Sequence, residues 1–157
     1  MDAKDYQILR ALQDNGRLSN QDLAERVHLS PSPCLRRVRL LEERGVIRGY
    51  AAQVDQKAYG LPITVFVRIR LDQHSEAVVR GFETRVAAAD EILDCYLMTG
   101  DADYLLRVVA TDLDAYERFV RQTLHAIPGI ASIETSFAYG VVKHRQVFPE
   151  LPAPGYG

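Results

Sequence analysis

The fold of the N-terminal part is decided by the stretch Ser30-Pro31-Ser32-Pro33-Cys34-Leu35-Arg36-Arg37-Val38-Arg39-Leu40-Leu41. A proline fits the first position of a helix, because the N–H that it lacks would have no partner there. Pro33 also disfavours a helical backbone for the residue before it, so we expect Ser32 to cap the helix and Pro33 to open it. Gly45 marks the end of this helix. Its buried stripe is predicted to consist of Leu35, Val38 and Leu41.

The sequence before this stretch predicts two further short helices. The first has apolar residues at helical spacing and stops at Asn15-Gly16; these residues are Ile8, Leu9 and Leu12. Next, Ser19-Asn20-Gln21-Asp22 fits a capping box at the start of a second helix. His28-Leu29-Ser30 then forms a short turn to the third helix. Three helices in which the last two are joined by such a turn have the form of a helix-turn-helix.

A helix-turn-helix of this kind would present arginines to DNA. Its third helix enters the major groove with the N-terminal end first, where arginine can pair with guanine through two hydrogen bonds. Ser32 and the free amides of the first turn suit a phosphate, and Asn20, Gln21 and Arg48 are expected at the DNA backbone. The predicted DNA contacts are Asn20, Gln21, Ser32, Pro33, Arg36, Arg37, Arg39 and Arg48.

The distribution of charge supports a single basic docking element. The chain has a formal net charge of -2, but residues 1–50 carry nine Lys and Arg against seven Asp and Glu, whereas residues 51–157 carry ten against fourteen. A net-acidic chain with one local arginine cluster is poor evidence for diffuse binding to polyanions. The alternative is a solvated basic face on a helical protein-interaction domain. The combination of cap, short turn, proline-opened helix and outward arginines favours DNA.

The pattern changes from helical to strand-like after a punctuated connection. Residues 46–54 look extended, as a small wing followed by a linker strand, and Tyr59-Gly60-Leu61-Pro62 precedes a new domain. The end of the chain, residues 151–157, is expected to be poorly ordered. The predicted domains are a helix-turn-helix at 1–50, a linker strand at 51–61, a sensing and oligomerisation domain at 62–147 and a tail at 148–157.

The second domain has the element order β-α-β-β-α-β. Helices are predicted at about 75–88 and 112–127, and strands at about 63–71, 92–99, 103–110 and 133–141. This order is that of the ferredoxin-like split unit, an α+β fold in which two helices cover one face of a sheet. Phe66, Arg68 and Arg70 would lie on the other face, where an exposed apolar surface requires cover. We therefore expect a dimer as the minimum unit.

Several classes of protein are excluded by what the sequence lacks. No run of about 18 apolar residues occurs, so no membrane span is expected, and the charged N-terminus predicts a cytoplasmic protein. Cys34 and Cys95 are far apart and the histidines are scattered, so we expect reduced, buried cysteines, no metal site and no cofactor. No phosphate loop and no Gly-x-Ser-x-Gly motif occurs, so we do not expect an enzyme.

A family resemblance is carried by Asp5–Leu9, Leu23–Val27, Leu29–Val38, Leu41-Glu42, Gly45–Ile47, Gly100–Leu106 and Ile127–Ile130. These stretches resemble the leucine-responsive/asparagine-synthetase (Lrp/AsnC) family of transcription regulators. The run Ser30–Leu35 is highly specific to that family, and the run Gly100–Tyr104 is moderately so. The resemblance covers essentially residues 5–145, with the same domain order.

The resemblance implies a winged helix-turn-helix, a linker strand and a ligand-responsive βαββαβ module. It also implies dimers that associate further, often to octamers, with amino-acid effectors bound between dimers and a pseudo-palindromic operator that matches the symmetry of the dimer. Two residues depart from the family pattern. His28 replaces a frequent glycine, and histidine tolerates the left-handed backbone of such a turn. Leu40 points outward where a basic residue is common in the family.

An effector site is predicted at the loop Thr99–Tyr104. An amino acid needs an acidic group for its ammonium and amides or hydroxyls for its carboxylate, and Gly100 lets a ligand approach the backbone. From the residues of the loop alone, a tight turn whose aspartates serve turn chemistry is the favoured interpretation. The resemblance favours sensing and adds matching positions on the last strand. The predicted effector contacts are Met98, Thr99, Gly100, Asp101, Asp103, Tyr104, Ser136, Phe137 and Ala138.

The neighbours of this loop favour an apolar effector. The side chains expected nearby, including Met98, Phe137 and Ala138, are apolar, and we expect no basic residue beside them. This favours leucine or methionine over an acidic amino acid. Two other functions stay open at this point. Sirohaem decarboxylases, which are enzymes, resemble the same family architecture but are expected to lack the outward arginines of the third helix. A pure assembly module would leave Arg36, Arg37 and Arg39 without a role.

Overall fold

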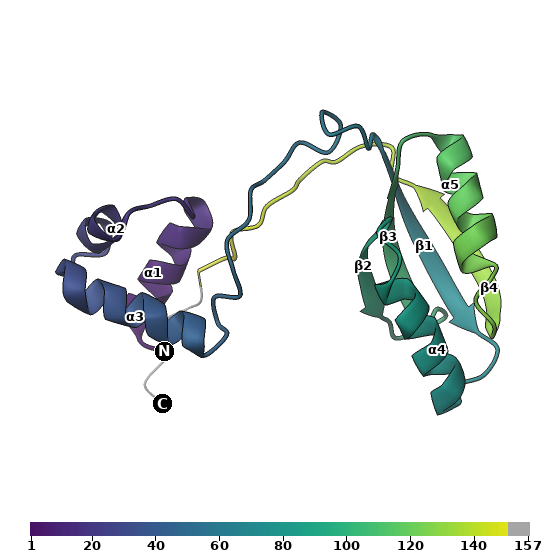
Figure 1. The fold of residues 1–157 in the computed structure, drawn as a ribbon, viewed down its shortest axis with the longest axis horizontal. Helices are drawn as coiled ribbons and strands as arrows, with labels where there is room; N and C mark the ends of the chain where they lie inside the picture. Colours follow the sequence, from purple (N-terminus) through teal and green to yellow (C-terminus); the bar gives the residue numbers. More distant parts are fainter. Residues whose placement is uncertain (151–157) are drawn as a thin grey trace. The chain divides into compact units, whose positions relative to one another are not determined.

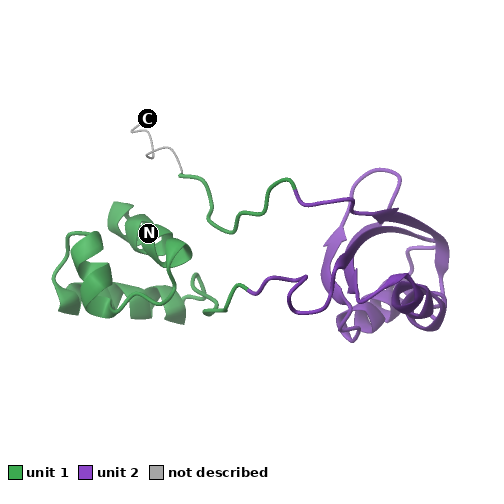
Figure 2. Ribbon diagram, turned by 90° about the horizontal axis from the view of Figure 1, so that it is seen from above, with its two compact units in different colours: residues 1–53, 142–157 green, residues 54–141 purple. Residues whose placement is uncertain are grey.

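The structure of the protein is a computed structural model that describes residues 1–150. The expectation of a poorly ordered end at residues 151–157 lies outside the described residues. The chain divides into two compact units, which we call the head and the sensing module (Figure 2). The head comprises Met1–Gln53 together with the chain from Val142 onward, and the sensing module comprises Val54–Val141.

The head contains three helices, α1 (Ala3–Asp14), α2 (Asn20–Arg26) and α3 (Pro31–Glu43) (Figure 1). Ser19 caps α2 by accepting a hydrogen bond from the amide of Asp22 at 3.1 Å, which confirms the predicted cap. His28 has a φ of 54°, so the left-handed backbone expected of the turn is also confirmed. The apolar core of the head consists of Ile8, Ala11, Leu23, Ala24, Val27, Cys34 and Leu41.

Two predictions about α3 are wrong. The helix begins at Pro31 with Ser30 as its N-cap, not at Pro33 with Ser32 as the cap. Both prolines lie in the first turn, where no backbone N–H has a partner within the helix, so neither interrupts it. The buried face contains Cys34 rather than Leu35, whose side chain is 38% exposed. The inward face is therefore rotated by about one residue from the predicted stripe.

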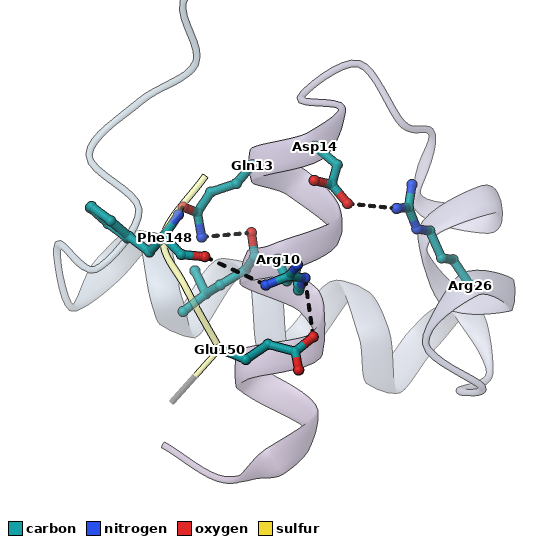
Figure 3. A network of polar contacts seen from close by, with 7 residues as sticks. Arg10, Gln13, Asp14, Arg26, Phe148 and Glu150 are labelled. Atoms are coloured by element: carbon teal, nitrogen blue, oxygen red, sulfur yellow. Dashed lines mark hydrogen bonds and ion pairs between the residues drawn. The ribbon is translucent and has the colours of Figure 1, made fainter. Parts of the chain in front are cut away.

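Two connections join the sensing module to the head, one before it in the chain and one after it. Residues 46–54, expected as a small wing and the start of a linker strand, form no paired strand within residues 1–150. An extended segment is assigned as a strand only when its backbone groups pair with another segment. At the other end, the chain returns to the head, where Gln13 accepts a hydrogen bond from the amide of Phe148 at 2.9 Å. Arg10 also pairs with Glu150 at 3.4 Å (Figure 3).

The sensing module is one four-stranded sheet with helices on one face (Figure 1). The strand order is β2-β3-β1-β4 and every neighbouring pair is antiparallel, so the predicted ferredoxin-like α+β fold is confirmed. The strands are β1 (Ile63–Leu71), β2 (Ile92–Leu97), β3 (Tyr104–Ala110) and β4 (Ile130–Phe137). The helices are α4 (Glu76–Ala87) and α5 (Leu113–Phe119), which continues as a π-helical turn, η1 (Val120–Leu124).

The two faces of the sheet have opposite character. Val65, Val67 and Ile69 of β1 are fully buried against the helices, and Phe82 of α4 is buried with them. Phe66 points to the other face and is 38% exposed. This alternation follows from the two-residue period of a strand and confirms the predicted open face.

The prediction that both cysteines are buried holds for one of them. Cys34 is fully buried in the head, whereas Cys95 is exposed. Neither cysteine forms a disulfide bond. Cys95 lies on β2, which is the last strand of the sheet and therefore has a neighbouring strand on one side only.

Candidate DNA-reading face and effector hollow

The exposed surface of α3 carries two free arginines. Arg36 and Arg39 are exposed and line a shallow depression together with Ser32, Leu35, Leu40 and Glu43. Neither arginine forms an ion pair within residues 1–150, so both guanidinium groups are available to an external partner. This surface is the natural candidate for contact with DNA bases.

Most of the other predicted DNA contacts are also exposed. Gln21, Ser32, Pro33 and Arg48 all lie at the surface of the head. Asn20 is half-buried and donates a hydrogen bond from its side-chain amide to the carbonyl of Pro31 at 2.9 Å. It therefore joins the start of α2 to the start of α3, which is a structural task within the head.

The prediction that Arg37 points outward is wrong. One guanidinium nitrogen, Nη1, lies 2.8 Å from a carboxylate oxygen of Asp2 and 2.8 Å from one of Asp5, at the start of α1. The helical wheel placed Arg37 outward because it took Leu35 as the centre of the apolar face. Once Cys34 takes that place, Arg37 moves towards α1. The acidic pair at the start of the chain was the signal that could have revealed this contact.

The open face of the sheet holds a hollow of about 510 Å³ beside the predicted effector loop. Antiparallel pairing places Glu134 opposite Arg68 and Ser132 opposite Arg70, so these four side chains share the open face. The loop that joins β2 to β3 closes one side of the hollow. The lining residues from the loop are Met98, Thr99, Gly100, Asp101 and Ala102.

Four of the nine predicted effector contacts lie in this hollow and five do not. Those in the lining are Met98, Thr99, Gly100 and Asp101. Asp103 instead accepts hydrogen bonds from the amide of Leu71 and from His74, both at 2.7 Å. These contacts, first the Leu71 amide and then His74, lower the pKa of Asp103. Both oxygens of Asp103 thus hold the loop against the end of β1.

The remaining predicted contacts are distributed over both faces of the sheet. Tyr104 is buried on the helix face, where its hydroxyl donates to Glu83 at 3.0 Å, and burial followed by that carboxylate raises its pKa to about 12. Phe137 also faces the helices and stacks edge-on against Tyr116, with ring centroids 5.3 Å apart. Ser136 is paired with Phe66 on the open face, and the amide of Ala138 donates to Thr64, but neither lines the hollow.

Sequence reasoning missed the strand residues of the hollow. The interpretation that no basic residue stands near the loop is wrong, because Arg68 and Arg70 line the same hollow as Asp101. The alternation of β1 correctly placed both arginines on the open face. Their proximity to the loop depends on the strand order and on the register between β1 and β3, which no local pattern reveals.

Comparison with known protein families identifies both domains. Residues 64–148 match the model of the Lrp/AsnC ligand binding domain, and residues 1–48 match that of a winged helix-turn-helix DNA-binding domain. The chain belongs to the Lrp/AsnC family. The resemblance noted in the sequence is thereby confirmed.

Individual relatives of this Lrp/AsnC protein match over nearly the whole chain. The Bkd operon transcriptional regulator of Pseudomonas aeruginosa is 46% identical over 149 residues, which cover 95% of this chain and 97% of that protein. The leucine-responsive regulatory protein of Escherichia coli K12 is 41% identical over 143 residues, 91% of this chain and 87% of its own. A Neisseria meningitidis transcriptional regulator, solved as a complex with L-Met, superposes with a TM-score of 0.90 at 39% identity, covering 95% and 96%.

These findings establish the general function of the chain. It is a DNA-binding transcription regulator with an amino-acid ligand-binding domain, and its relatives are regulators rather than enzymes. No helix of the described residues is long and apolar enough to cross a membrane. Nor does that part of the chain contain a cluster of three or more His, Cys, Asp or Glu suited to a metal ion.

Proposed function

We propose that this Lrp/AsnC protein is a cytoplasmic regulator that binds a pseudo-palindromic operator and responds to a small apolar amino acid, leucine or methionine. It acts as a homodimer that associates to an octamer. The single observation that carries the effector assignment is the hollow, which combines an unpaired arginine, an unpaired aspartate and apolar walls on one open sheet face.

The charges of the hollow fit one zwitterion. Arg68 and Glu134 form an exposed ion pair with a nitrogen–oxygen distance of 4.0 Å, so together they add no net charge to the hollow. Within the described residues, Arg70 and Asp101 form no ion pair, which leaves one cation for the effector carboxylate and one anion for its ammonium. An acidic effector would bring a second carboxylate towards Asp101 and Glu134, where like charges repel.

The walls of the hollow fit an apolar side chain. Met98, Ala102 and Leu105 line it, and Gly100 adds no side chain that would narrow it. Methionine and leucine expose flexible apolar groups that such walls would bury. The L-Met complex of the Neisseria meningitidis relative supports this choice.

A partner subunit is proposed because the open face is partly apolar. Phe66 and Tyr96 are 38% and 54% exposed on it, in the isolated chain. Burial of such a surface between two copies would remove it from water, and a two-fold symmetric dimer would present two copies of α3 to the two halves of an operator. Sedimentation at micromolar concentration is expected to show a dimer or a larger assembly, and a monomer would contradict the proposal.

Calorimetry with each of the twenty amino acids tests the effector site. Leucine or methionine is expected to bind, and Asp101→Asn and Arg70→Gln are expected to weaken that binding about tenfold each, because each variant removes one charge-assisted contact. Arg80→Gln on α4 is the matched control, since Arg80 pairs with Glu76 outside the hollow. Unchanged affinity in both hollow variants would place the effector elsewhere.

A further inference from the structure

Arg37 lies on the recognition helix α3 but faces away from the exposed surface that carries Arg36 and Arg39. Its side chain is 29% exposed, whereas Asp5, one of its two partners, is 14% exposed. The guanidinium donates to Asp2 and to Asp5 with equal distances of 2.8 Å. These bonds join residues 35 and 32 positions apart in the sequence, so they connect the middle of α3 to the start of α1.

The two carboxylates that hold Arg37 also close the first turn of α1. Asp2 accepts a hydrogen bond from the amide of Asp5 at 3.0 Å, and Asp5 accepts one from the amide of Asp2 at 2.9 Å. Each carboxylate therefore gives one oxygen to the helix cap and the other to Arg37. The same contacts lower the pKa of Asp2, first through the Asp5 amide, and raise the pKa of Arg37, first through Asp5.

The core contacts of α3 within the head are apolar. Among the described residues, its other side-chain hydrogen bonds to the rest of the head lie near its two ends, from Asn20 to the carbonyl of Pro31 and from Tyr50 to Glu42. Cys34 and Leu41 pack in a core with small neighbours such as Ala11 and Ala24. The hydrophobic effect has no direction, and Asn20 and Tyr50 bind α3 only near its ends, so Arg37 provides the directional contact from the middle of α3 to α1. Charge-assisted hydrogen bonds from a guanidinium are directional, and here they end on a helix terminus whose own geometry is fixed by a capping box.

We propose that Arg37 is a positioning residue for operator reading and makes no contact with DNA. It fixes the rotation of α3 on the capped start of α1, so that Arg36 and Arg39 meet the edges of the bases. Successive residues of a helix point about 100° apart, so even a modest rotation of α3 would turn Arg36 away from its base. Specific binding therefore depends on Arg37, while attraction to the DNA backbone does not.

Neutral variants of the two aspartates distinguish positioning from direct reading. If Arg37 positions α3, removal of the charges on Asp2 and Asp5 lowers specificity just as loss of Arg37 does. If Arg37 reads DNA and is restrained by these carboxylates, their removal frees it and raises specificity. Asparagine is the suitable replacement at both positions, because its carbonyl still accepts the capping hydrogen bond while its charge is lost.

The experiment measures the affinity of the full-length protein for two duplexes over a series of salt concentrations. One duplex is selected by the wild-type protein from random sequence, and the other is a scrambled duplex of equal length and composition. The proteins are wild type, Arg37→Gln, Asp2→Asn/Asp5→Asn, the triple variant that combines them, and Arg36→Gln as the matched control. The ratio of the two affinities cancels the general electrostatic effect of a changed net charge.

The expected result is a ratio that falls about tenfold both in Arg37→Gln and in Asp2→Asn/Asp5→Asn. The triple variant should be no worse than Arg37→Gln, because all three residues act through one network. Arg36→Gln should also lower the ratio, because it removes one of the side chains that Arg37 is proposed to position. The salt dependence of binding to the scrambled duplex should be the same for Arg37→Gln as for wild type.

Three results would overturn the proposal. The first is a ratio that rises or stays constant in Asp2→Asn/Asp5→Asn. The second is a salt dependence for Arg37→Gln that becomes shallower by about one unit, because that marks a lost phosphate contact. The third is an equal loss of affinity for both duplexes in the aspartate variant, because a positioning role affects the selected duplex alone.

Discussion

Two of the sensing-module glycines with a left-handed backbone, Gly100 and Gly129, differ in their surroundings. Gly129 precedes β4 with a φ of 88°, and a Cβ atom there would lie 2.5 Å from Cγ1 of Val78. Gly100 lies in the effector loop with a φ of 106°, and a Cβ atom there would meet nothing within 4 Å. Both positions carry a backbone cost for any other residue, but only Gly129 also has a close neighbour.

Alanine at these two positions is therefore expected to destabilise the protein unequally. Gly100→Ala should lower the free energy of unfolding by about 1 kcal/mol through backbone strain alone. Gly129→Ala should lower it by about 1–3 kcal/mol more, because Val78 must move to admit the new methyl group. Chemical denaturation of both variants and wild type measures this difference. Equal loss in the two variants would show that the turn relaxes around the added Cβ.

At the scale of elements, the sequence predicted what depends on local pattern and failed where distant segments meet. The alternation of β1 and the order of helices and strands were sufficient to predict the α+β fold and the open sheet face. The face of α3 was predicted wrongly because Leu35 was treated as buried. Exposed leucines are common, whereas cysteine is among the residues most often buried.

The candidate effector site was likewise predicted only in part, because some of its residues meet only where distant segments of the chain come together. The loop residues Gly100 and Asp101 were identified from turn chemistry and family resemblance. Arg70 joins them only because β1 lies next to β3 in the sheet, and Arg37 meets Asp5 only because α1 packs against α3. Such contacts depend on the register and packing of segments that are remote in the sequence.

The hydrogen-bonded contact between the end of β1 and the start of β3 is expected to weaken at acidic pH. Asp103 holds the Leu71 amide, and its lowered pKa means that the folded state favours the ionised carboxylate. Its contribution to stability is therefore fully present above the unfolded pKa of about 3.9 and is lost as pH falls through the lower folded pKa. Asp103→Asn should remove this dependence, because asparagine does not titrate.

Urea unfolding followed by NMR signals of β1 measures this effect at neutral pH and near pH 3. Wild type should lose more stability on acidification than Asp103→Asn, and Asp90→Asn, an exposed aspartate without an ion pair among the described residues, should behave as wild type. The same acid sensitivity in Asp103→Asn and wild type would assign the loss to other carboxylates.

On the scale of the whole molecule, the chain connects the two units twice. It leaves the head after Gln53 and returns to it at Val142, a few residues beyond β4, whose Ser132 and Glu134 line the hollow. The returning segment, residues 142–150, is held on α1 by Gln13 and Arg10, which bind the backbone of Phe148 (Figure 3). Arg10 also forms an ion pair with Glu150, but the Glu150 side chain is largely exposed and such a pair contributes little. Within the described residues, docking therefore depends mainly on these backbone contacts.

The docking of residues 142–150 on α1 should be weak enough that their release from the helix can be measured by proteolysis. Gln13→Ala removes the acceptor of the Phe148 amide, and the loss of one such hydrogen bond, about 1 kcal/mol, should raise the undocked population about fivefold. Trypsin should then cleave after Lys143 and Arg145 about fivefold faster, since both residues lie in the segment that is released. Cleavage after Lys57, in the other connection, should not change.

Gln7→Ala, on the exposed side of the same helix, is the matched control for helix stability. If Gln13→Ala accelerates cleavage at Lys57 as much as at Lys143, the head has loosened as a whole and the segment is not held by Gln13.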